Sequence, residues 1–352
     1  MKLYRIPEAP NLLSMTYFHA LAKEGIESLV LVRPTTAYVS TGYFQDPSSC
    51  VNFDYCESRG IPVVRREVGG GTVLLDQGQV FFHVVLRRDH PLLQRGVDRL
   101  YQVFSAPVIA TYERLGVRTA LRPVNDIVTM EGKKIAGLGG ANIGPCGVFV
   151  GSIIMDFDVA TMVQCLNLPD EKFRDKVWKS MESAMTTLRA ENGVMPEPLD
   201  VFNALAEEFG KLLGPLDESA PDPAVLEMAH RLESEMLVRP ETLKEAQQAV
   251  KIKSGWHVAR AHHKAPGGLI SVYIVVGDGA VQDVQVTGDF TMWPKEALSS
   301  LEQSIKGARR HELPERIESA LRDTGAVVPG VRAEDFVQAT ESAWAQIREG
   351  TA

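Results

Sequence analysis

Apolar residues recur at three- and four-residue spacing over several long stretches of the chain, a pattern that predicts amphipathic helices. Pro107 and Pro169 are expected to interrupt two of these helices, because proline removes a backbone hydrogen bond. The predicted helices cover residues 11–24, 47–60, 93–116, 159–190, 199–214, 223–237, 241–251, 295–306, 313–323 and 333–347.

Short runs rich in Val, Ile, Leu and aromatic residues separate the helices and predict strands. Three glycines, Gly69 to Gly71, predict a turn within a hairpin-like succession of strands, and Glu131-Gly132 predicts a second hairpin. A glycine-rich loop is expected after that second hairpin. The predicted strands cover residues 28–34, 36–42, 61–67, 69–75, 79–86, 150–159, 255–264, 267–279 and 280–290, with two more inside 125–141.

The order of these elements predicts an α+β protein with two domains. Helices and strands are mixed up to about residue 250, whereas from Gly255 three strands follow one another and helices come last. The acidic, proline-rich segment 215–224 is a candidate connecting segment. A stretch of about 100 residues can fold alone, so we expect domains at 1–248 and 249–352.

Composition favours a soluble globular protein. The 352 residues are 45% hydrophobic and 23% charged, which excludes collagen-like, coiled-coil and disordered classes. Lys and Arg number 37 against 45 Asp and Glu, a net charge of −8 that argues against nucleic acid as the main partner. The N-terminus lacks a signal-peptide core and no stretch reaches transmembrane length, so no membrane partner is expected. Four cysteines without a C-x-x-C pair indicate a reduced, cytoplasmic protein.

The first candidate site combines Arg65-Arg66 with the three glycines. Each glycine costs roughly 0.5–1 kcal/mol inside a regular element, so three in succession indicate a close approach of the backbone to another group. Exposed N–H groups beside guanidinium groups suit a phosphate or carboxylate. For the three glycines taken alone, a sharp hairpin turn flanked by surface arginines is the favoured interpretation.

The second candidate site lies some way further along, at Asn125-Asp126 and Lys133-Lys134. A lysine on a strand, followed by small residues, can project its ammonium group into a cleft. Such a group neutralises charge that develops on a phosphoryl or carboxyl oxygen. The alternative is a solvated lysine pair at the tip of a hairpin.

Together, the patterns R-R-x-x-G-G-G-x-V-x-x-D, N-D and G-K-K-I-A-G resemble the lipoate–protein ligase A family, which is related to biotin ligases and octanoyl transferases. The resemblance extends to about Leu188 and resumes at residues 278–290, which resemble the family's accessory domain. It implies a class II synthetase-like biotin/lipoate ligase catalytic domain, with a mixed β-sheet flanked by helices, at 1–248. A small α+β accessory domain would occupy 249–352.

The resemblance also implies roles for individual residues. Lys134 would be the catalytic lysine that contacts the activated carboxylate and the α-phosphate, and Asp126 would help to hold Mg²⁺. Gapless counting from the lysine makes Ser152 a ligand contact. The implied substrate- and ATP-binding positions are Arg66, Gly69, Gly70, Gly71, Thr72, Val73, Asn125, Asp126, Lys134, Gly137 and Ser152.

Three positions depart from the family pattern. Val68 replaces a Ser or Thr before the glycines, and Leu75 replaces a histidine often found before Asp76. Val150 replaces the histidine of a His-Gly pair, so a general base is expected to be absent there. These departures are compatible with a specialised branch of the family that has a different acceptor.

The activity implied is ATP-dependent activation of lipoate to lipoyl-AMP, followed by transfer of the lipoyl group to a lysine of an acceptor protein. ATP and Mg²⁺ would be required. The implied acceptors are the glycine-cleavage H protein, the E2 lipoyl domains of 2-oxoacid dehydrogenases, or the lipoate-binding proteins of sulfur oxidation. Lipoate and octanoate are not distinguished by the sequence.

Other activities use the same fold. Octanoyl transferases take a thioester donor and rely on a cysteine; Cys146, in an apparent glycine turn, is the candidate, whereas Cys165 is expected to be a buried apolar residue. A non-catalytic lipoyl-binding protein is a third possibility. Biotin ligation is disfavoured because the G-R-G-R signature is absent.

The second domain contributes two further observations. His257, His262 and His263 are close enough to suggest a metal site, but His262 would face away from the other two on a strand, so a polar strand is favoured. Gly288-Asp289-Phe290 resembles an accessory-domain motif expected to close over the active site during adenylation.

Overall fold

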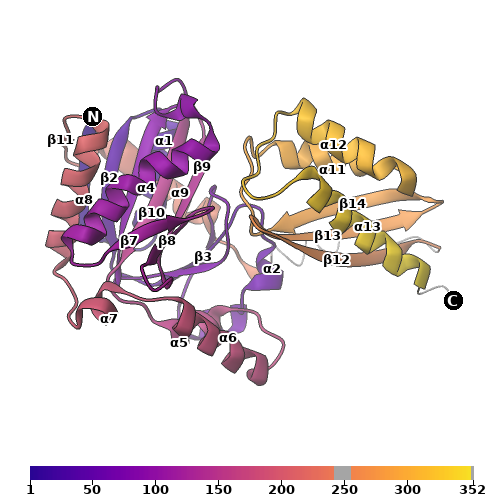
Figure 1. The fold of residues 1–352 in the computed structure, drawn as a ribbon, viewed down its shortest axis with the longest axis horizontal. Helices are drawn as coiled ribbons and strands as arrows, with labels where there is room; N and C mark the ends of the chain where they lie inside the picture. The colour runs from indigo at the N-terminus through magenta and orange to yellow at the C-terminus, as the bar shows by residue number, and fades with distance from the viewer. Residues whose placement is uncertain (242–254, 350–352) are drawn as a thin grey trace. The chain divides into compact units, whose positions relative to one another are not determined.

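The computed structural model describes residues 1–241 and 255–349 (Figure 1). The chain divides into two compact units. The first unit consists of Met1–Thr41, Pro47–Glu67 and Thr72–Val238, and the second of Gly42–Asp46, Val68–Gly71 and Arg239–Ala352. The expected boundary at 248/249 and most of the predicted helix at 241–251 lie outside the described residues.

A large mixed sheet organises the first unit, with strand order β11-β1-β2-β6-β10-β9-β8-β7 (Figure 1). Strand β1 runs parallel to β2 and to β11, and the remaining neighbours are antiparallel. The strands are β1 (Lys2–Ala9), β2 (Ser28–Pro34), β6 (Gln79–Arg87), β7 (Thr119–Arg122), β8 (Asp126–Thr129), β9 (Lys134–Ile143), β10 (Cys146–Ile154) and β11 (Asp217–Glu218).

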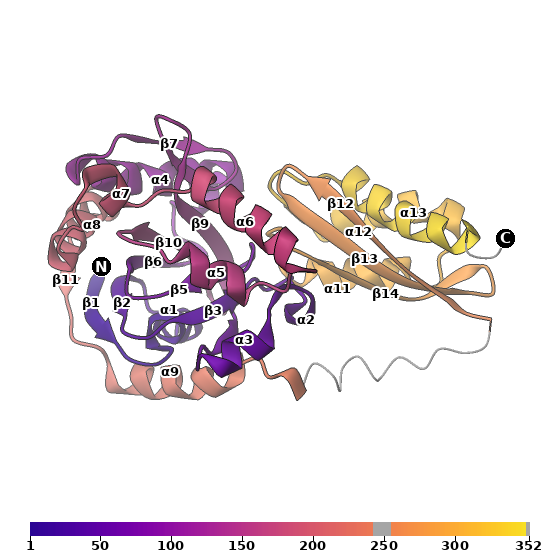
Figure 2. The same cartoon turned by 90° about the horizontal axis from the view of Figure 1, so that it is seen from below.

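Helices cover both faces of this sheet (Figure 2). Phe82 on β6 packs against Phe209 at a ring distance of 5.1 Å, whereas the next residue, His83, stacks on Phe18 at 4.2 Å. Successive strand residues point to opposite faces, so α8 and α1 lie on opposite sides. Helix α4 packs on α8 and α9 packs on α1. These helices are α1 (Leu13–Lys23), α4 (Val97–Arg114), α8 (Pro198–Leu213) and α9 (Pro223–Met236).

A small sheet with the order β4-β3-β5 completes the first unit, together with short helices. Its core is lined by Val39, Leu74, Met162 and two buried cysteines. The elements are β3 (Tyr38–Thr41), β4 (Val63–Arg65), β5 (Val73–Leu75), α2 (Pro47–Cys50), α3 (Phe53–Ser58), α5 (Val159–Cys165), α6 (Glu171–Ala184) and α7 (Leu188–Asn192), with the 3₁₀ helix η1 (Leu93–Arg95) preceding α4.

The predicted hairpin around the three glycines is wrong. Strands β4 and β5 lie on opposite sides of β3, and β6 belongs to the large sheet. The predicted helix at 47–60 is divided into α2 and α3, because Val51 forms a bridge with Leu166. Local glycine and helix signals could not anticipate these long-range pairings.

Two further expectations are wrong for a similar reason. The expected glycine-rich loop after Lys134 is part of strand β9, where pairing with β8 and β10 on either side satisfies its backbone groups. Helix α4 continues through Pro107, because Phe104, Val108 and Tyr112 are fully buried and their burial offsets the roughly 3 kcal/mol cost of the proline. The segment 215–224 does not connect the units; it adds β11 to the first sheet and leads into α9.

The second unit contains an antiparallel three-stranded sheet and helices, as the sequence predicts. Its core includes Phe290, Phe336 and Trp344, and also Phe44, which stacks on Phe290 at 5.0 Å. The elements are β12 (His257–Ala265), β13 (Gly268–Gly277), β14 (Ala280–Gly288), α11 (Ala297–Ile305), η2 (Arg310–Glu312), α12 (Leu313–Asp323) and α13 (Ala333–Glu349). Among the described helices of both units, none has the length and apolarity needed to cross a membrane.

Candidate functional site

Lys134 stands at the start of β9 and forms an ion pair with Asp126 on the neighbouring β8. Its Nζ lies 2.7 Å from Asp126 Oδ1, while Arg122 NH2 donates to Asp126 Oδ2 at 2.9 Å. Partial burial tends to raise the pKa of Asp126, but the two cations outweigh it and hold the pKa below its usual value. The structure therefore brings together Lys134, Asp126 and a second cation, Arg122, that the sequence motifs did not single out.

The ammonium group of Lys134 lies over a defined face of β9. A Cβ on Gly137 would lie 3.4 Å from Lys134 Nζ, so the ammonium occupies the space that a side chain at 137 would fill. Gly139 is two residues further along and has the same orientation. Neither glycine has a side chain, so β9 itself places no side chain on this face at residues 137 and 139.

Asn125 anchors the hairpin that carries these groups. Its side-chain Nδ2 donates to the carbonyl of Leu138 at 2.7 Å, and the Leu138 N–H donates to the carbonyl of Asn125 at 2.8 Å. These paired bonds fix the start of β8 against β9. In this structure Asn125 holds the backbone that presents Asp126.

Arg66 lies after β4 and is held by the small sheet. Its NH1 donates to the carbonyl oxygen of Ser40 at 2.9 Å and to Ser40 Oγ at 3.3 Å. Burial lowers the pKa of Arg66 to about 10, so the guanidinium is still charged at neutral pH. Positive charge placed in a poorly solvated setting is suited to an anionic ligand.

The three glycines belong to the second unit, where they pack against the turn after β14. The Gly70 N–H donates to the carbonyl of Phe290 at 3.2 Å, and Gly70 has a φ of 90°, which favours glycine. A Cβ on Gly69 would come within 2.8 Å of Thr291 atoms. Close approach of the backbone thus explains Gly69 and a positive φ explains Gly70, whereas a Cβ on Gly71 would meet only Asp289 Cβ, at 3.8 Å. The Gly70 N–H would have to leave Phe290 before it could bind an anion.

The residues after the glycines belong to the first unit. Thr72 leads into β5, and Val73 at its start is 38% exposed, unusually high for a large apolar residue. Both follow the glycine segment directly in the chain.

Ser152 and Val150 lie on one face of β10, opposite Phe81 and His83 of β6 respectively. Ser152 Oγ donates to Gln79 Oε1 at 3.2 Å. Val150 and Ser152 are both half-buried. The predicted site residues Ser152, on β10, and Gly137 and Lys134, on β9, thus share one side of two adjacent strands.

His83 is a residue of this face that the sequence analysis missed. It stands directly across from Val150 in the pairing of β6 with β10. It is 4% exposed, burial lowers its pKa to about 3, and its Nδ1 has no hydrogen-bond partner within the described residues. Nothing in the local sequence marks it, because only the strand register places it opposite Val150.

The expectation that Cys146 lies in an exposed glycine turn is wrong. Cys146 begins β10 and is fully buried, and this burial raises the pKa of its thiol. Cys165 is buried as predicted, and its thiol is hydrogen-bonded to Cys56. Burial and a raised pKa make Cys146 a poor nucleophile.

Two of the three histidines of β12 contact polar side chains of the second unit. His262 Nδ1 lies 2.7 Å from Ser271 Oγ, and His263 Nε2 lies 2.8 Å from Asp335 Oδ1. The described parts of the chain hold no cluster of three or more His, Cys, Asp or Glu side chains able to bind a metal.

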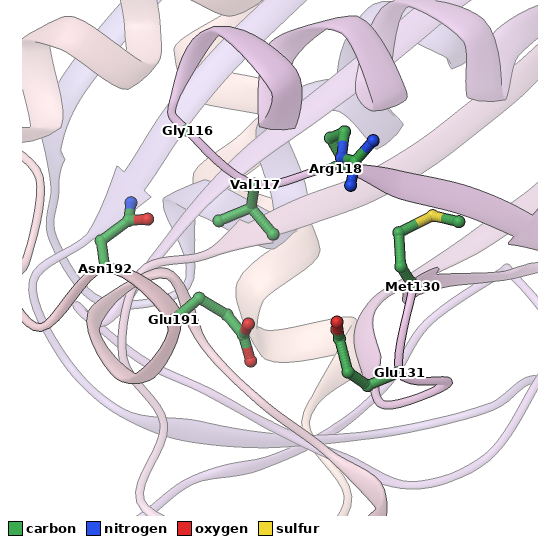
Figure 3. Close-up of a pocket in the computed structure, with 7 residues that line it drawn as sticks. All are labelled: Gly116, Val117, Arg118, Met130, Glu131, Glu191 and Asn192. Atoms are coloured by element: carbon green, nitrogen blue, oxygen red, sulfur yellow. The ribbon is translucent and has the colours of Figure 1, made fainter.

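A separate pocket of about 150 Å³ is lined by the tip of the β8–β9 hairpin, the segment after α4 and helix α7 (Figure 3). Glu131 and Glu191 point their carboxylates toward its centre in Figure 3, and Met130 and Asn192 lie at its edge. None of the site residues predicted from the sequence lines this pocket. Its charged lining consists of two carboxylates, from Glu131 and Glu191, and one guanidinium group, from Arg118.

Two family models match the chain, "Lipoyl protein ligase A/B catalytic domain" over residues 9–210 and "Bacterial lipoate protein ligase C-terminus" over residues 258–339. The chain is 30% identical over 199 residues to octanoyltransferase LipM of Kyrpidia tusciae, which covers 50% of this chain and 72% of that protein. It is 28% identical over 249 residues to lipoate-protein ligase LplJ of Bacillus subtilis, which covers 68% of this chain and 69% of that protein.

A solved structure has the same fold. It is a bipartite lipoate protein ligase from Thermoplasma acidophilum, described together with its E2 lipoyl domain. The TM-score is 0.60 at 24% identity, and the match covers 72% of this chain and 98% of that chain.

Proposed function

The chain belongs to the family of lipoyl protein ligase A/B catalytic domains, and from that premise we propose that it is an ATP-dependent lipoate–protein ligase. The observation that carries this proposal is the second match, to a lipoate protein ligase C-terminus over residues 258–339. The alignment with the ligase LplJ covers 68% of the chain, whereas that with the transferase LipM covers 50%. We propose the division at 248/249 on the same grounds.

In the first step, the carboxylate of lipoate attacks the α-phosphate of ATP, pyrophosphate leaves, and lipoyl-AMP forms. The protein contributes positioning and charge neutralisation rather than a nucleophile. Lys134 and Arg66 supply positive charge for the carboxylate and the phosphate. An anionic ligand would compete with Asp126 for the ammonium group of Lys134.

Asp126 fits the requirements of a magnesium ligand in part. Mg²⁺ prefers oxygen ligands and is often held by one or two carboxylates together with substrate phosphates and water, and Asp126 offers one carboxylate beside Lys134. When bound, the ion would neutralise phosphate charge. Asp126 would then orient the nucleotide while Lys134 holds the carboxylate end of lipoate.

In the second step, the ε-amine of an acceptor lysine attacks the mixed anhydride and AMP leaves. AMP is a good leaving group, so this step does not require a cysteine. The Thermoplasma ligase was described with an E2 lipoyl domain, which supports E2 lipoyl domains as acceptors here, with the H protein and sulfur-oxidation lipoate-binding proteins as further candidates. A cytoplasmic location is part of the same proposal.

An ATP-independent octanoyl transferase is the second candidate, favoured by the 30% identity to LipM. Such an enzyme needs a reactive thiol. The burial of Cys146 and Cys165 argues against either of them as that thiol, whereas Cys50 is half-buried.

The deciding experiment is intact-protein mass spectrometry of an apo E2 lipoyl domain incubated with the protein, lipoate and Mg²⁺, with and without ATP. A parallel reaction offers an octanoyl-carrier-protein thioester without ATP. The ligase proposal predicts a lipoyl adduct only in the presence of ATP. Both reactions are repeated with an H protein and a sulfur-oxidation lipoate-binding protein as the acceptor. An adduct from the thioester alone would identify a transferase, and the absence of an adduct in both reactions with all three acceptors would favour a lipoyl-binding protein.

A further inference from the structure

The unpartnered Nδ1 of His83 calls for a physical explanation. A buried polar atom without a partner costs about 1–3 kcal/mol, and His83 is 4% exposed. The ring stacks on Phe18 at 4.2 Å and lies 6.2 Å from the ring of Phe81. A buried imidazole whose nitrogen has no hydrogen-bond partner among the described residues is a candidate for contact with a bound ligand.

His83 lies on the same face of the sheet as the ammonium group of Lys134. Gly139 pairs with Val150, and Val150 pairs with His83, so these three residues form one row across β9, β10 and β6. Residues paired across antiparallel strands point to the same side. Lys134 Nζ lies close to the place where a Cβ on Gly137 would be. Gly137 and Gly139 face the same side of the sheet, so the ammonium group lies on the side to which the side chains of this row point.

The register also gives the distance between the two groups. Along β9, Gly139, which belongs to the row of His83, lies two residues from Gly137, a distance of about 7 Å. Across the sheet, β6 is two strands away from β9, a distance of about 10 Å. The separation from Lys134 Nζ is therefore roughly 12 Å. An extended octanoyl chain is about 9 Å long from its first to its last carbon, given bonds of roughly 1.5 Å, and a charge-assisted contact at the carboxylate adds about 3 Å.

A ligand whose carboxylate meets Lys134 would thus place the far end of its acyl chain at His83. Lipoate and octanoate have the same carboxylate and the same length of carbon chain, and they differ at that far end. Lipoate carries a dithiolane, whose sulfur atoms accept weak hydrogen bonds and favour aromatic neighbours, whereas octanoate ends in a methyl group.

We propose, on the basis of the proposed function, that His83 determines which acyl group this enzyme accepts. Its Nδ1–H would donate to a dithiolane sulfur, so that lipoate is preferred to octanoate. Octanoate would leave the buried nitrogen without a partner. Sites built around a polar contact discriminate against analogues that lack it. The depressed pKa of His83 keeps the ring neutral, which suits an uncharged end of the ligand.

The test measures the binding of lipoate and of octanoate by calorimetry without ATP or acceptor. We expect the preference of the wild type for lipoate to fall about tenfold in His83→Phe. His83→Asn, whose amide can occupy the place of Nδ1, should keep most of the preference. Tyr4→Phe is the matched control, because Tyr4 is another fully buried residue of the sheet with an unpartnered polar atom, and it should leave both affinities unchanged.

A second measurement uses the wild-type protein and does not depend on the folding of a variant. In protein labelled with ¹⁵N-histidine, the Nδ1 resonance of His83 should shift with lipoate and stay in place with octanoate. Equal shifts with both ligands, or an unchanged preference in folded His83→Phe, would overturn the proposal. Because neither measurement needs ATP, a protein that binds lipoate selectively but forms no adenylate would refute the ligase proposal and retain this one.

Discussion

The two ends of the β9–β10–β6 face differ in how their side chains are held. At one end, Lys134, Asp126 and Arg122 pair with one another while partly exposed to water. At the other end, His83 is buried between aromatic rings, and its Nδ1 has no hydrogen-bond partner in the part of the chain that the structure describes. Ion pairs in contact with water are weak and exchange readily, whereas a buried polar group is costly unless it is matched.

This difference indicates that the two ends contact different parts of a ligand. The charged end can exchange its internal partners for a carboxylate, a phosphate or a metal ion without a large cost. The aromatic end is rigid and can reject a ligand of the wrong chemistry. Charge neutralisation would therefore determine the rate, and the buried imidazole would determine which acyl group is used.

The largest effect is expected from Lys134→Ala. Removing a preorganised cation from a developing charge typically lowers the rate about 100- to 1,000-fold, so lipoate-dependent exchange of pyrophosphate into ATP should fall by at least that range. Lys133→Ala is the matched control, because Lys133 is the exposed neighbour, and it should retain activity. Wild-type rates of pyrophosphate exchange in a folded Lys134→Ala variant would show that the ammonium group of Lys134 takes no part in adenylation.

Asp126→Asn should have the next largest effect. Loss of the carboxylate removes the partner of Lys134 and the candidate magnesium ligand, and we expect a fall in exchange of about 10- to 100-fold. The melting temperature should hardly change, because partly exposed ion pairs contribute at most about 1 kcal/mol. Arg122→Gln removes only the second cation and should cost less; an equal loss in both variants would contradict a special role for Asp126.

The sequence located the charged end but not the aromatic end. Asn125, Asp126 and Lys134 stand on one hairpin, so their spacing in the chain reflects their spacing in space. His83 comes within reach of Lys134 only through two strand pairings, and a single sequence does not state which residues are paired. The order of elements in the second unit was predictable because its strands are consecutive hairpins.

The glycine patterns show the same limit. Gly137 was read correctly as a small residue beside the lysine, but the segment around it was predicted to be a loop and is a strand. Whether glycine-rich backbone forms a loop or a strand depends on partners that lie far away in the chain. The packing of Gly69 and Gly70 against Phe290 and Thr291 depends on residues more than two hundred positions later.

The aromatic end predicts a dependence of stability on pH. His83 has a folded-state pKa of about 3 and an unfolded value near 6.5. Between these values the unfolded chain binds the extra proton, so this contribution to stability is complete above pH 6.5 and is lost as the pH falls toward 3. From pH 7.5 to pH 5 the wild type should lose about 2 kcal/mol through this group. His83→Phe should lack that part of the loss in urea titrations, and equal losses in both proteins would show that His83 is not held neutral.

The smallest effect is expected from Cys146→Ser. Cys146 lies four residues before Val150 on β10, at the end of the β9–β10 pair that is farther from Lys134. We therefore expect it to contact neither the carboxylate nor the far end of the acyl chain. Ligase turnover should remain close to the wild-type rate, with a stability cost of about 1 kcal/mol for the buried hydroxyl. A loss of acyl transfer with normal adenylation would reveal a reactive thiol and favour the transferase.

The most direct test of the two-ended face is a crystal structure of the protein with bound lipoate, with the sulfur atoms located by their anomalous scattering. The account predicts a carboxylate oxygen about 2.8 Å from Lys134 Nζ and a sulfur atom about 5 Å or less from the His83 ring. Lipoate in the reverse orientation, or bound away from the row that links Gly139, Val150 and His83, would contradict it.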